Sequence, residues 1–321
     1  MMIRSMLAVL VAVFGMSAAP AQDYPTRPVT IIVGFAAGGI ADLGARLLAE
    51  YITRETGQAV VVENRTAAAG TVGMAAVAKA APDGYTLGLV LSGNLVINPF
   101  VQKQMPFDAL KDLVPVAALG DAPQMIALNA EVPAKTLKEF VALAKAKPGT
   151  MHYGSAGPGS LPHLSAAHFA RMAGIDLVHV PYRGNAPATT DLLAGRIQVL
   201  SSSIGGLRAG LDAGKIRLLL TATKARLPYL PDVPTSAEAG LPGYIMSVWL
   251  GVVAPSGTPQ AVIGRIHALV AGMLKDPAAQ KRMAAAGLDV MAMSQGEFAA
   301  FVRAEYARWQ RIVRDAGVEP Q

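Results

Sequence analysis

Short apolar runs alternate with helical patterns along most of this chain, and this alternation restricts the fold more than any other feature of the sequence. Residues 29–33 form a β-branched run, and apolar residues then recur at helical spacing from Ile40 to Tyr51. Further strand-like runs follow at 59–63 and 86–91. Such alternation is typical of α/β folds, in which helices cover both faces of a mostly parallel sheet. The sequence therefore predicts an α/β protein.

The middle of the chain repeats this scheme, and its end adds a proline-rich connection and more helices. Helices are expected at 71–80, 135–145, 161–172, 189–194, 260–274 and 295–316, and strands at 177–180, 197–200, 216–221 and 249–254. Because a domain averages about 150 residues, the 321 residues indicate two domains. We expect the chain to cross into the second domain near Ala122 and to return near Tyr244. Domain 1 is then 22–122 with 245–321, and domain 2 is 123–244.

The first 21 residues have the plan of a cleaved secretory signal. Arg4 gives a short positive region, residues 6–16 are apolar, and Ala19-Pro20-Ala21 is a small-residue cleavage site. The apolar run is shorter than the ~20 residues of a membrane span, so an uncleaved anchor is the less favoured alternative. The sequence thus predicts a signal peptide over 1–21 and a mature chain in the periplasm.

Composition and spacing give little support to several other classes of function. The chain has no cysteine, and its net charge of +6 comes from interspersed residues rather than a basic run. His163 and His168 are five residues apart with no Glu between them, which favours packing or capping over metal binding. Ser155 and Ser160 do not fit the G-x-S-x-G pattern of hydrolases. We therefore expect no enzyme activity, no metal and no cofactor.

Several loops that follow strands carry glycine, alanine and hydroxyl residues. The first, GFAAGG, fits neither the P-loop nor the dinucleotide-binding pattern, so it offers N–H groups at a helix N-terminus, or it is only a turn. Similar loops recur at Ser155–Ser160, Tyr182–Ala186 and Ser201–Gly205. Loops at the carboxyl ends of strands converge on one crevice in open α/β sheets. The pattern predicts a cleft between two domains that binds a small anionic molecule.

These same segments resemble a known family. The stretches PTRPVTIIVGFAAGGIADLGARLLA, VVVENRTAAAGTVG, APDGYTLGL, YGSAGPGSLPHL, HVPYRGNAPATTDLLAG, LPDVPTSAEAGLPGY and VVAPSGTPQAVI follow one another as in the Bug family. Its members are extracytoplasmic receptors of tripartite tricarboxylate transporters. The resemblance implies a type II periplasmic-binding-protein fold, with two doubly wound domains that close on a carboxylate held by backbone amides, hydroxyls and water.

The resemblance and the loop pattern together give a set of expected ligand-binding residues. They are Phe35, Ala36, Ala37, Gly38, Gly39, Asp42, Ser92, Asn94, Ser155, Ala156, Gly157, Gly159, Ser160, His163, Tyr182, Arg183, Gly184, Asn185, Ala186 and Ser203. The sequence departs from the family at two places. The usual E-N-R-P-G-A-G-G reads ENRTAAAG at 63–70, and Gln198 stands where an acidic residue is frequent.

The expected function is therefore capture of a small carboxylate for the membrane permease of a tripartite transporter. The protein is expected to act as a monomer without nucleic acid. Two alternatives remain open from the residues alone. One is an exported hydrolase or isomerase on the same architecture, and the other is a sensor-type receptor without a permease.

Overall fold

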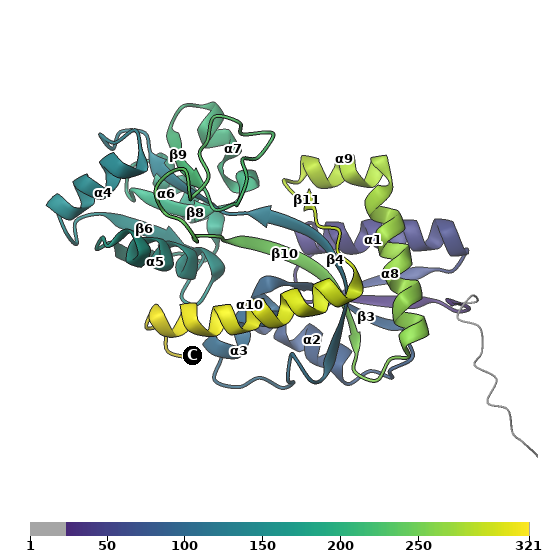
Figure 1. Cartoon of the computed structure of the whole chain (residues 1–321). Helices are drawn as coiled ribbons and strands as arrows, with labels where there is room; N and C mark the ends of the chain where they lie inside the picture. The colour runs from purple at the N-terminus through teal and green to yellow at the C-terminus, as the bar shows by residue number, and fades with distance from the viewer. Residues whose placement is uncertain (1–23, 321) are drawn as a thin grey trace, which may run out of the picture.

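Two mixed β-sheets organise the protein in the computed structural model, which describes residues 24–320 (Figure 1). The predicted signal peptide lies outside the described residues. The first sheet has the strand order β11-β4-β10-β3-β1-β2, and the second has the order β7-β6-β8-β5-β9. The strands are β1 Val29–Val33, β2 Val60–Asn64, β3 Thr86–Leu91, β4 Leu113–Pro123, β5 Met125–Asn129, β6 His152–Ser155, β7 Val178–Pro181, β8 Val199–Ser202, β9 Ile216–Thr221, β10 Ser247–Pro255 and β11 Asp289–Val290.

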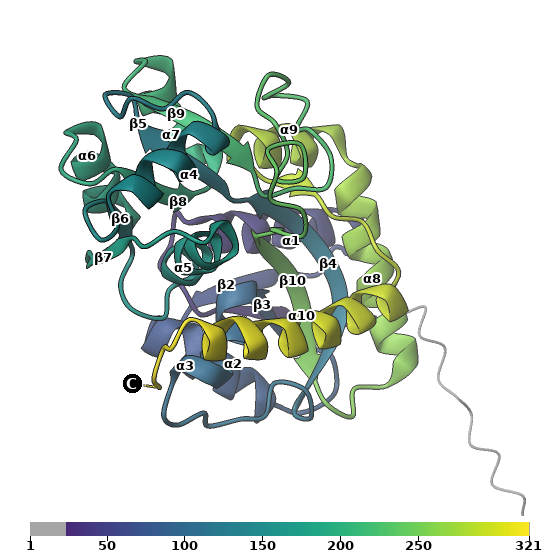
Figure 2. The same cartoon turned by 60° about the vertical axis from the view of Figure 1, so that its left-hand side comes forward.

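Helices lie on both faces of each sheet, as expected for an α/β fold (Figure 2). They are α1 Ile40–Thr56, α2 Thr71–Ala78, α3 Asn98–Val101, α4 Leu137–Ala146, α5 Leu161–Ala173, α6 Asn185–Leu193, α7 Ile204–Asp212, α8 Gln260–Lys275, α9 Pro277–Ala285 and α10 Gln295–Asp315, with the short turns η2 Ala68–Gly70 and η3 Gly93–Ile97. Within the described residues, none of these helices combines the length and the apolar character that a membrane crossing requires. The predicted α/β class is confirmed.

The sheets are more antiparallel than the alternation in the sequence indicated. Strands β1, β2 and β3 are parallel to one another, as are β6, β7 and β8. However, β10 runs antiparallel to both β3 and β4, and β5 runs antiparallel to β8 and β9. These antiparallel strands are the segments that connect the sheets, so they must run against the strands of the repeating units.

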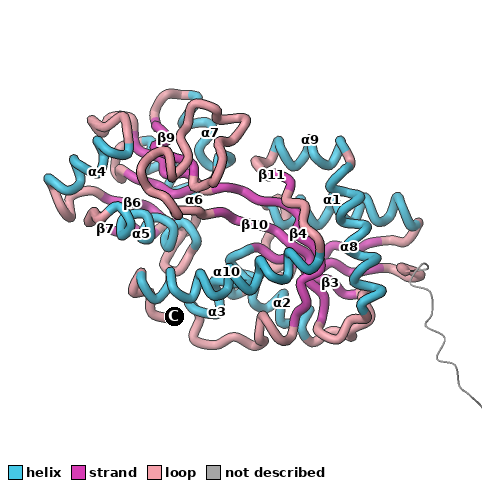
Figure 3. The backbone as a smooth tube through the Cα atoms, viewed as in Figure 1, coloured by secondary structure: helices cyan, strands magenta, loops and turns pink. Residues whose placement is uncertain are grey.

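Two strand segments carry the chain between the sheets (Figure 3). β4 ends at Pro123 and β5 begins at Met125, and the chain returns to the first sheet where β10 begins at Ser247. The Gln124 N–H donates to the Met246 carbonyl at 2.8 Å, and the Met246 N–H donates to the Ala222 carbonyl at 3.1 Å. The two crossings are therefore held side by side by backbone hydrogen bonds.

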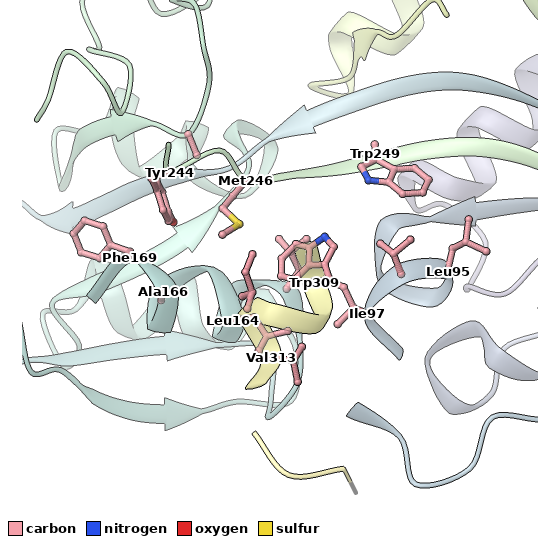
Figure 4. Packing of buried hydrophobic residues seen from close by; sticks show 14 of the residues in the cluster. Leu95, Ile97, Leu164, Ala166, Phe169, Tyr244, Met246, Trp249, Trp309 and Val313 are labelled. Atoms are coloured by element: carbon pink, nitrogen blue, oxygen red, sulfur yellow. The ribbon is translucent and has the colours of Figure 1, made fainter. Parts of the chain in front are cut away.

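Helix α10 packs against elements of both sheets. It begins at a capping box, in which the Ser294 side chain and the Glu297 side chain each bond the other's backbone N–H. Its Trp309 is fully buried and lies between Ile97 of η3 and Leu164 of α5 (Figure 4). One hydrophobic core thus extends from the first sheet, past α10, to the second.

Candidate functional site

A cavity of about 410 Å³ lies between the loops of the two sheets. Its lining comes from both sides: Phe35, Ala69, Leu91, Ser92, Gly93, Asn94, Ile97, Asn98, Val101, Gln102 and Val248 from the first, and Ala156, Pro158, Gly159, Ser160 and Leu161 from the second. Strands β1 and β3 are parallel, so the loops that follow them lie at one edge of the sheet. This shared edge explains why residues distant in the sequence meet here.

The loop after β1 is closed by a carboxylate of its own helix. Asp42 is buried and accepts hydrogen bonds from the Gly38 N–H at 3.0 Å, from Arg46 Nε at 2.9 Å and from Asn64 Nδ2 at 3.1 Å. These bonds, led by that from Arg46, lower the pKa of Asp42 to about 2. Asp42 therefore occupies the Gly38 N–H of this loop, because it lies in the first turn of α1 and folds back onto Gly38.

The rest of this loop is only partly at the cavity. Phe35 lines it, whereas Ala36, Ala37, Gly38 and Gly39 are exposed and do not. The expectation of free N–H groups is wrong for Gly38, whose N–H is bonded to Asp42.

The loop after β6 also bonds largely to itself. The Ser160 hydroxyl donates to the Gly157 carbonyl at 2.6 Å, and the Gly159 N–H donates to His163 Nδ1 at 3.1 Å. Burial, with a smaller contribution from His179, lowers the pKa of His163 to about 4, so its ring is neutral at pH 7. His163 thus bonds the backbone just before its own helix, whose N-cap is Ser160. Ser160 and Gly159 still present part of their surface to the cavity.

A serine–histidine pair lies beside this loop. Ser155 Oγ is 2.7 Å from His179 Nε2, and the His179 ring stacks on the His163 ring with centroids 4.0 Å apart. His179 was not among the predicted site residues; its position on the neighbouring strand β7 brings it to Ser155. However, Ser155 is fully buried, and its hydroxyl also contacts the backbone of Gly157. Among residues 24–320, no acidic side chain bonds the other ring nitrogen of His179.

The loops after β7 and β8 do not reach the cavity. The Tyr182 hydroxyl donates to Asp191 at 2.8 Å, and Arg183 is exposed. Ser203 precedes α7 without a side-chain cap. The structure therefore separates the predicted residues into two groups: Phe35, Ser92, Asn94, Ala156, Gly159 and Ser160 line the cavity, and Ala36, Ala37, Gly38, Gly39, Asp42, Ser155, Gly157, His163, Tyr182, Arg183, Gly184, Asn185, Ala186 and Ser203 do not.

A helical face at the cavity wall was not predicted from the sequence. One side is lined by Asn94 and Ile97 of η3, by Asn98 and Val101 of α3, and by Gln102, which directly follows α3. Their spacing of three, four, seven and eight residues from Asn94 is that of one helix face. This helical spacing is present in the sequence. However, polar and apolar residues share the face, so the segment does not have the pattern of an amphipathic helix.

The segment 67–70 differs from the family pattern and forms the cavity rim. Ala68 and Ala69 have positive φ angles of 47° and 52°, a region where alanine is strained by roughly 1–2 kcal/mol per residue. Side chains hold this turn, because Asn98 Nδ2 donates to the Ala69 carbonyl at 3.0 Å and Gln102 Nε2 donates to the Ala68 carbonyl at 2.9 Å.

The second departure lies elsewhere. Gln198 bonds the backbone of His152 and Gly195, and it does not line the cavity.

Among the described polar side chains of the lining, Asn94 alone has a buried nitrogen or oxygen without a hydrogen-bond partner. It is fully buried, and its Oδ1 accepts the Leu91 N–H at 2.9 Å. This bond fixes the orientation of the carboxamide, because only the oxygen can accept. Its Nδ2 is buried and has no partner among the described residues. A buried donor without a partner costs free energy, so a ligand acceptor here would be favourable. The described residues contain no cluster of three or more side chains suited to a metal.

Comparisons with known proteins agree with this architecture. Residues 44–318 match the family described as "Tripartite tricarboxylate transporter family receptor". BugT of Bordetella pertussis is 33% identical over 317 residues, covering 98% of this chain and 97% of that protein. Two solved Rhodopseudomonas palustris proteins are similar. Rpa4515, solved with adipate, is 33% identical with a TM-score of 0.79 over 93% of this chain and 100% of its own. MatC, solved with bound malate, is 32% identical with a TM-score of 0.75, and the match covers 90% of this chain and 100% of MatC. With a family match over most of its length and relatives above 30% identity, this chain belongs to the receptor family of tripartite tricarboxylate transporters.

Proposed function

We propose that this protein captures a small carboxylate in the cavity between its two sheets and delivers it to a membrane permease. The observation that carries the proposal is Asn94, a residue of the cavity lining whose buried Nδ2 has no partner among the described residues. Ser92 lies beside it, with its hydroxyl 3.5 Å from the Ser247 carbonyl, a distance too long for a strong hydrogen bond. The adipate and malate bound by similar proteins support the carboxylate class.

We also propose the division of the chain that this function requires. Residues 22–122 with 245–321 act as one domain and 123–244 as the other, with Gln124 and Met246 at the crossings. Rotation about these two segments would open and close the cavity, whose lining comes from both sides. Paired crossing strands allow such a motion without breaking either sheet.

Location and partners follow from the family. Family membership and similarity to a solved "periplasmic transporter" imply a periplasmic protein. We propose that residues 1–21 are the signal for this export and that the mature chain acts as a monomer. Its partner is then the membrane component of a tripartite transporter.

A hydrolase is the second candidate, because Ser155 and His179 are paired as a nucleophile and base would be. Two features argue against it. Ser155 is fully buried, and its hydroxyl is already held by the backbone of its own loop. We therefore propose that the protein binds its ligand without changing it.

Thermal unfolding with a panel of carboxylic acids tests the function. A true ligand stabilises the folded protein by about 2.7 kcal/mol at a hundredfold excess over Kd. Recovery of the same acid unchanged after incubation, measured by mass spectrometry, separates binding from catalysis. Stabilisation by neutral sugars alone, or consumption of the acid, would contradict the proposal.

A further inference from the structure

A second cavity, of about 400 Å³, lies between the two proposed domains on the other side of the crossing strands. Its lining residues are Ile204, Gly205, Arg208 and Tyr229 from 123–244, and Ala284, Ala285, Gly287 and Asp289 from the rest of the chain. In the first sheet, β1 and β3 lie on one side of the pair β10 and β4, and β11 lies on the other. In the second sheet, β6 and β9 lie on opposite sides of β5. The loops after β1, β3 and β6 line the first cavity, whereas β11 and the segment after β9 line the second.

Two contacts join the proposed domains at this second cavity. The Tyr229 hydroxyl donates a hydrogen bond to Asp289 Oδ2 at 3.1 Å. The start of α7 packs against the turn before β11, since a Cβ added to Gly287 would lie only 3.1 Å from Ile204 Cγ2. Ile204 is buried, and Tyr229 and Asp289 are half-buried. We call these two contacts together the rear contact.

Closure of the first cavity would stretch the rear contact. Backbone hydrogen bonds hold the crossings at Gln124 and Met246 side by side, so a rotation of the domains turns about these segments. A rotation that brings the loops after β1 and β3 toward the loop after β6 moves groups on the opposite side apart. A side-chain hydrogen bond is lost once its donor and acceptor separate beyond about 3.5 Å. The rear contact therefore favours the arrangement in which the first cavity is wider.

From this geometry we infer that the rear contact lowers ligand affinity from outside the first cavity, because it must break when the domains close on a ligand. The inference rests on the domain rotation of the proposed function and names residues that set its equilibrium. When only a fraction of the molecules has the binding-competent arrangement, the apparent Kd is the intrinsic Kd divided by that fraction. Tyr229 and Asp289 are then positioning residues that control affinity without touching the ligand.

Distance measurements without any ligand test the rear contact directly. The chain has no cysteine, so Ala213→Cys just after α7 and Lys281→Cys on α9 place one spin label on each domain, at exposed positions. Tyr229→Phe removes the hydrogen-bond donor. It should shift the distance distribution from double electron–electron resonance to longer values. Tyr85→Phe is the control, because the Tyr85 hydroxyl bonds Thr26 within one domain. Identical distributions in Tyr229→Phe and the wild type would overturn the inference.

Ligand affinity provides the second measurement. Isothermal titration calorimetry on the full chain uses succinate, adipate, benzoate and octanoate as probes. For every acid that binds, Kd should be about three- to tenfold lower in Tyr229→Phe, the factor expected for the net contribution of one hydrogen bond. Kd should be unchanged in Tyr85→Phe. An equal or higher Kd in Tyr229→Phe would overturn the inference and leave the proposed function intact. Failure of all four acids to bind would contradict the proposed function, and the label distances would still support or overturn the role of the rear contact.

Discussion

The loops that follow β1 and β3 lie at one edge of the same sheet, yet they use their hydrogen-bond donors in opposite ways. After β1, the buried carboxylate of Asp42 accepts the Gly38 N–H and two side-chain donors. After β3, the carboxamide of Asn94 is fixed by one bond, and its buried Nδ2 has no partner within residues 24–320. Asp42 thus occupies the Gly38 N–H of the first loop, whereas the second loop keeps a side-chain donor without a partner among the described residues. A helix N-terminus becomes an anion site only when the protein does not supply the anion itself.

The largest effect expected from this comparison is on stability rather than affinity. Asp42→Ala removes one acceptor from three donors in a largely buried setting, so the free energy of unfolding should fall by about 2–4 kcal/mol. Kd of the folded variant should change less than threefold. Urea unfolding and calorimetry measure the two quantities. Glu50→Ala is the control, since its exposed ion pair with Arg282 should contribute at most about 1 kcal/mol. A large loss of affinity in Asp42→Ala would place the ligand at the first loop.

Acid should weaken the first loop and leave the second unchanged. The pKa of Asp42 is lowered from 3.8 to about 2, chiefly by its bond with Arg46. The folded state therefore holds this proton less tightly than the unfolded state. The ionised Asp42 side chain contributes roughly 2 kcal/mol to the free energy of unfolding. This contribution is fully present above about pH 4 and is lost as pH falls toward 2. Asp42→Asn should flatten the dependence of unfolding free energy on pH in this range, whereas Asn94→Ala should not.

Two glycines with nearly equal φ angles provide a finer test. Gly38 has φ of 86° and open space where a Cβ would be, whereas Gly70 has φ of 87° and a Cβ there would lie 2.9 Å from Asn94 Nδ2. Both changes to alanine pay the strain of a positive φ, about 1 kcal/mol. Only Gly70→Ala should also displace the Asn94 carboxamide and raise Kd about tenfold. Equal Kd values for the two variants would show that the position of Asn94 does not matter.

The sequence predicted the architecture well because apolar periodicity and glycine turns are local signals. The predicted helices at 260–274 and 295–316 correspond to α8 and α10, and the family resemblance is confirmed. The antiparallel crossings were less accessible, because the pairing of β10 with β4 joins segments more than a hundred residues apart. Local patterns contain no information about such pairing.

The candidate site was harder to predict than the fold. A glycine-rich loop after a strand predicts an anion site even where a nearby acidic side chain bonds the loop, as Asp42 bonds the Gly38 N–H. His179 was missed because its contact with Ser155 depends on the register of two neighbouring strands. Asn94 was predicted, but its decisive property, a donor left without a partner, appears only once the surrounding bonds are known. Whether a hydrogen-bond donor has a partner depends on the tertiary structure.

Arg183 gives the smallest expected effect and the last test of the comparison. It is the one cation in the predicted set of ligand residues, so a cationic clamp on the carboxylate would have to use it. A buried bidentate arginine would dominate affinity. In the structure Arg183 is exposed, lies in the loop between β7 and α6, and does not line the cavity. Arg183→Ala should therefore change Kd less than twofold by calorimetry, with Arg303→Ala on the exposed face of α10 as the matched control. Abolished binding in folded Arg183→Ala, together with unchanged binding in Asn94→Asp, would move the site from the loop after β3 to the loop after β7.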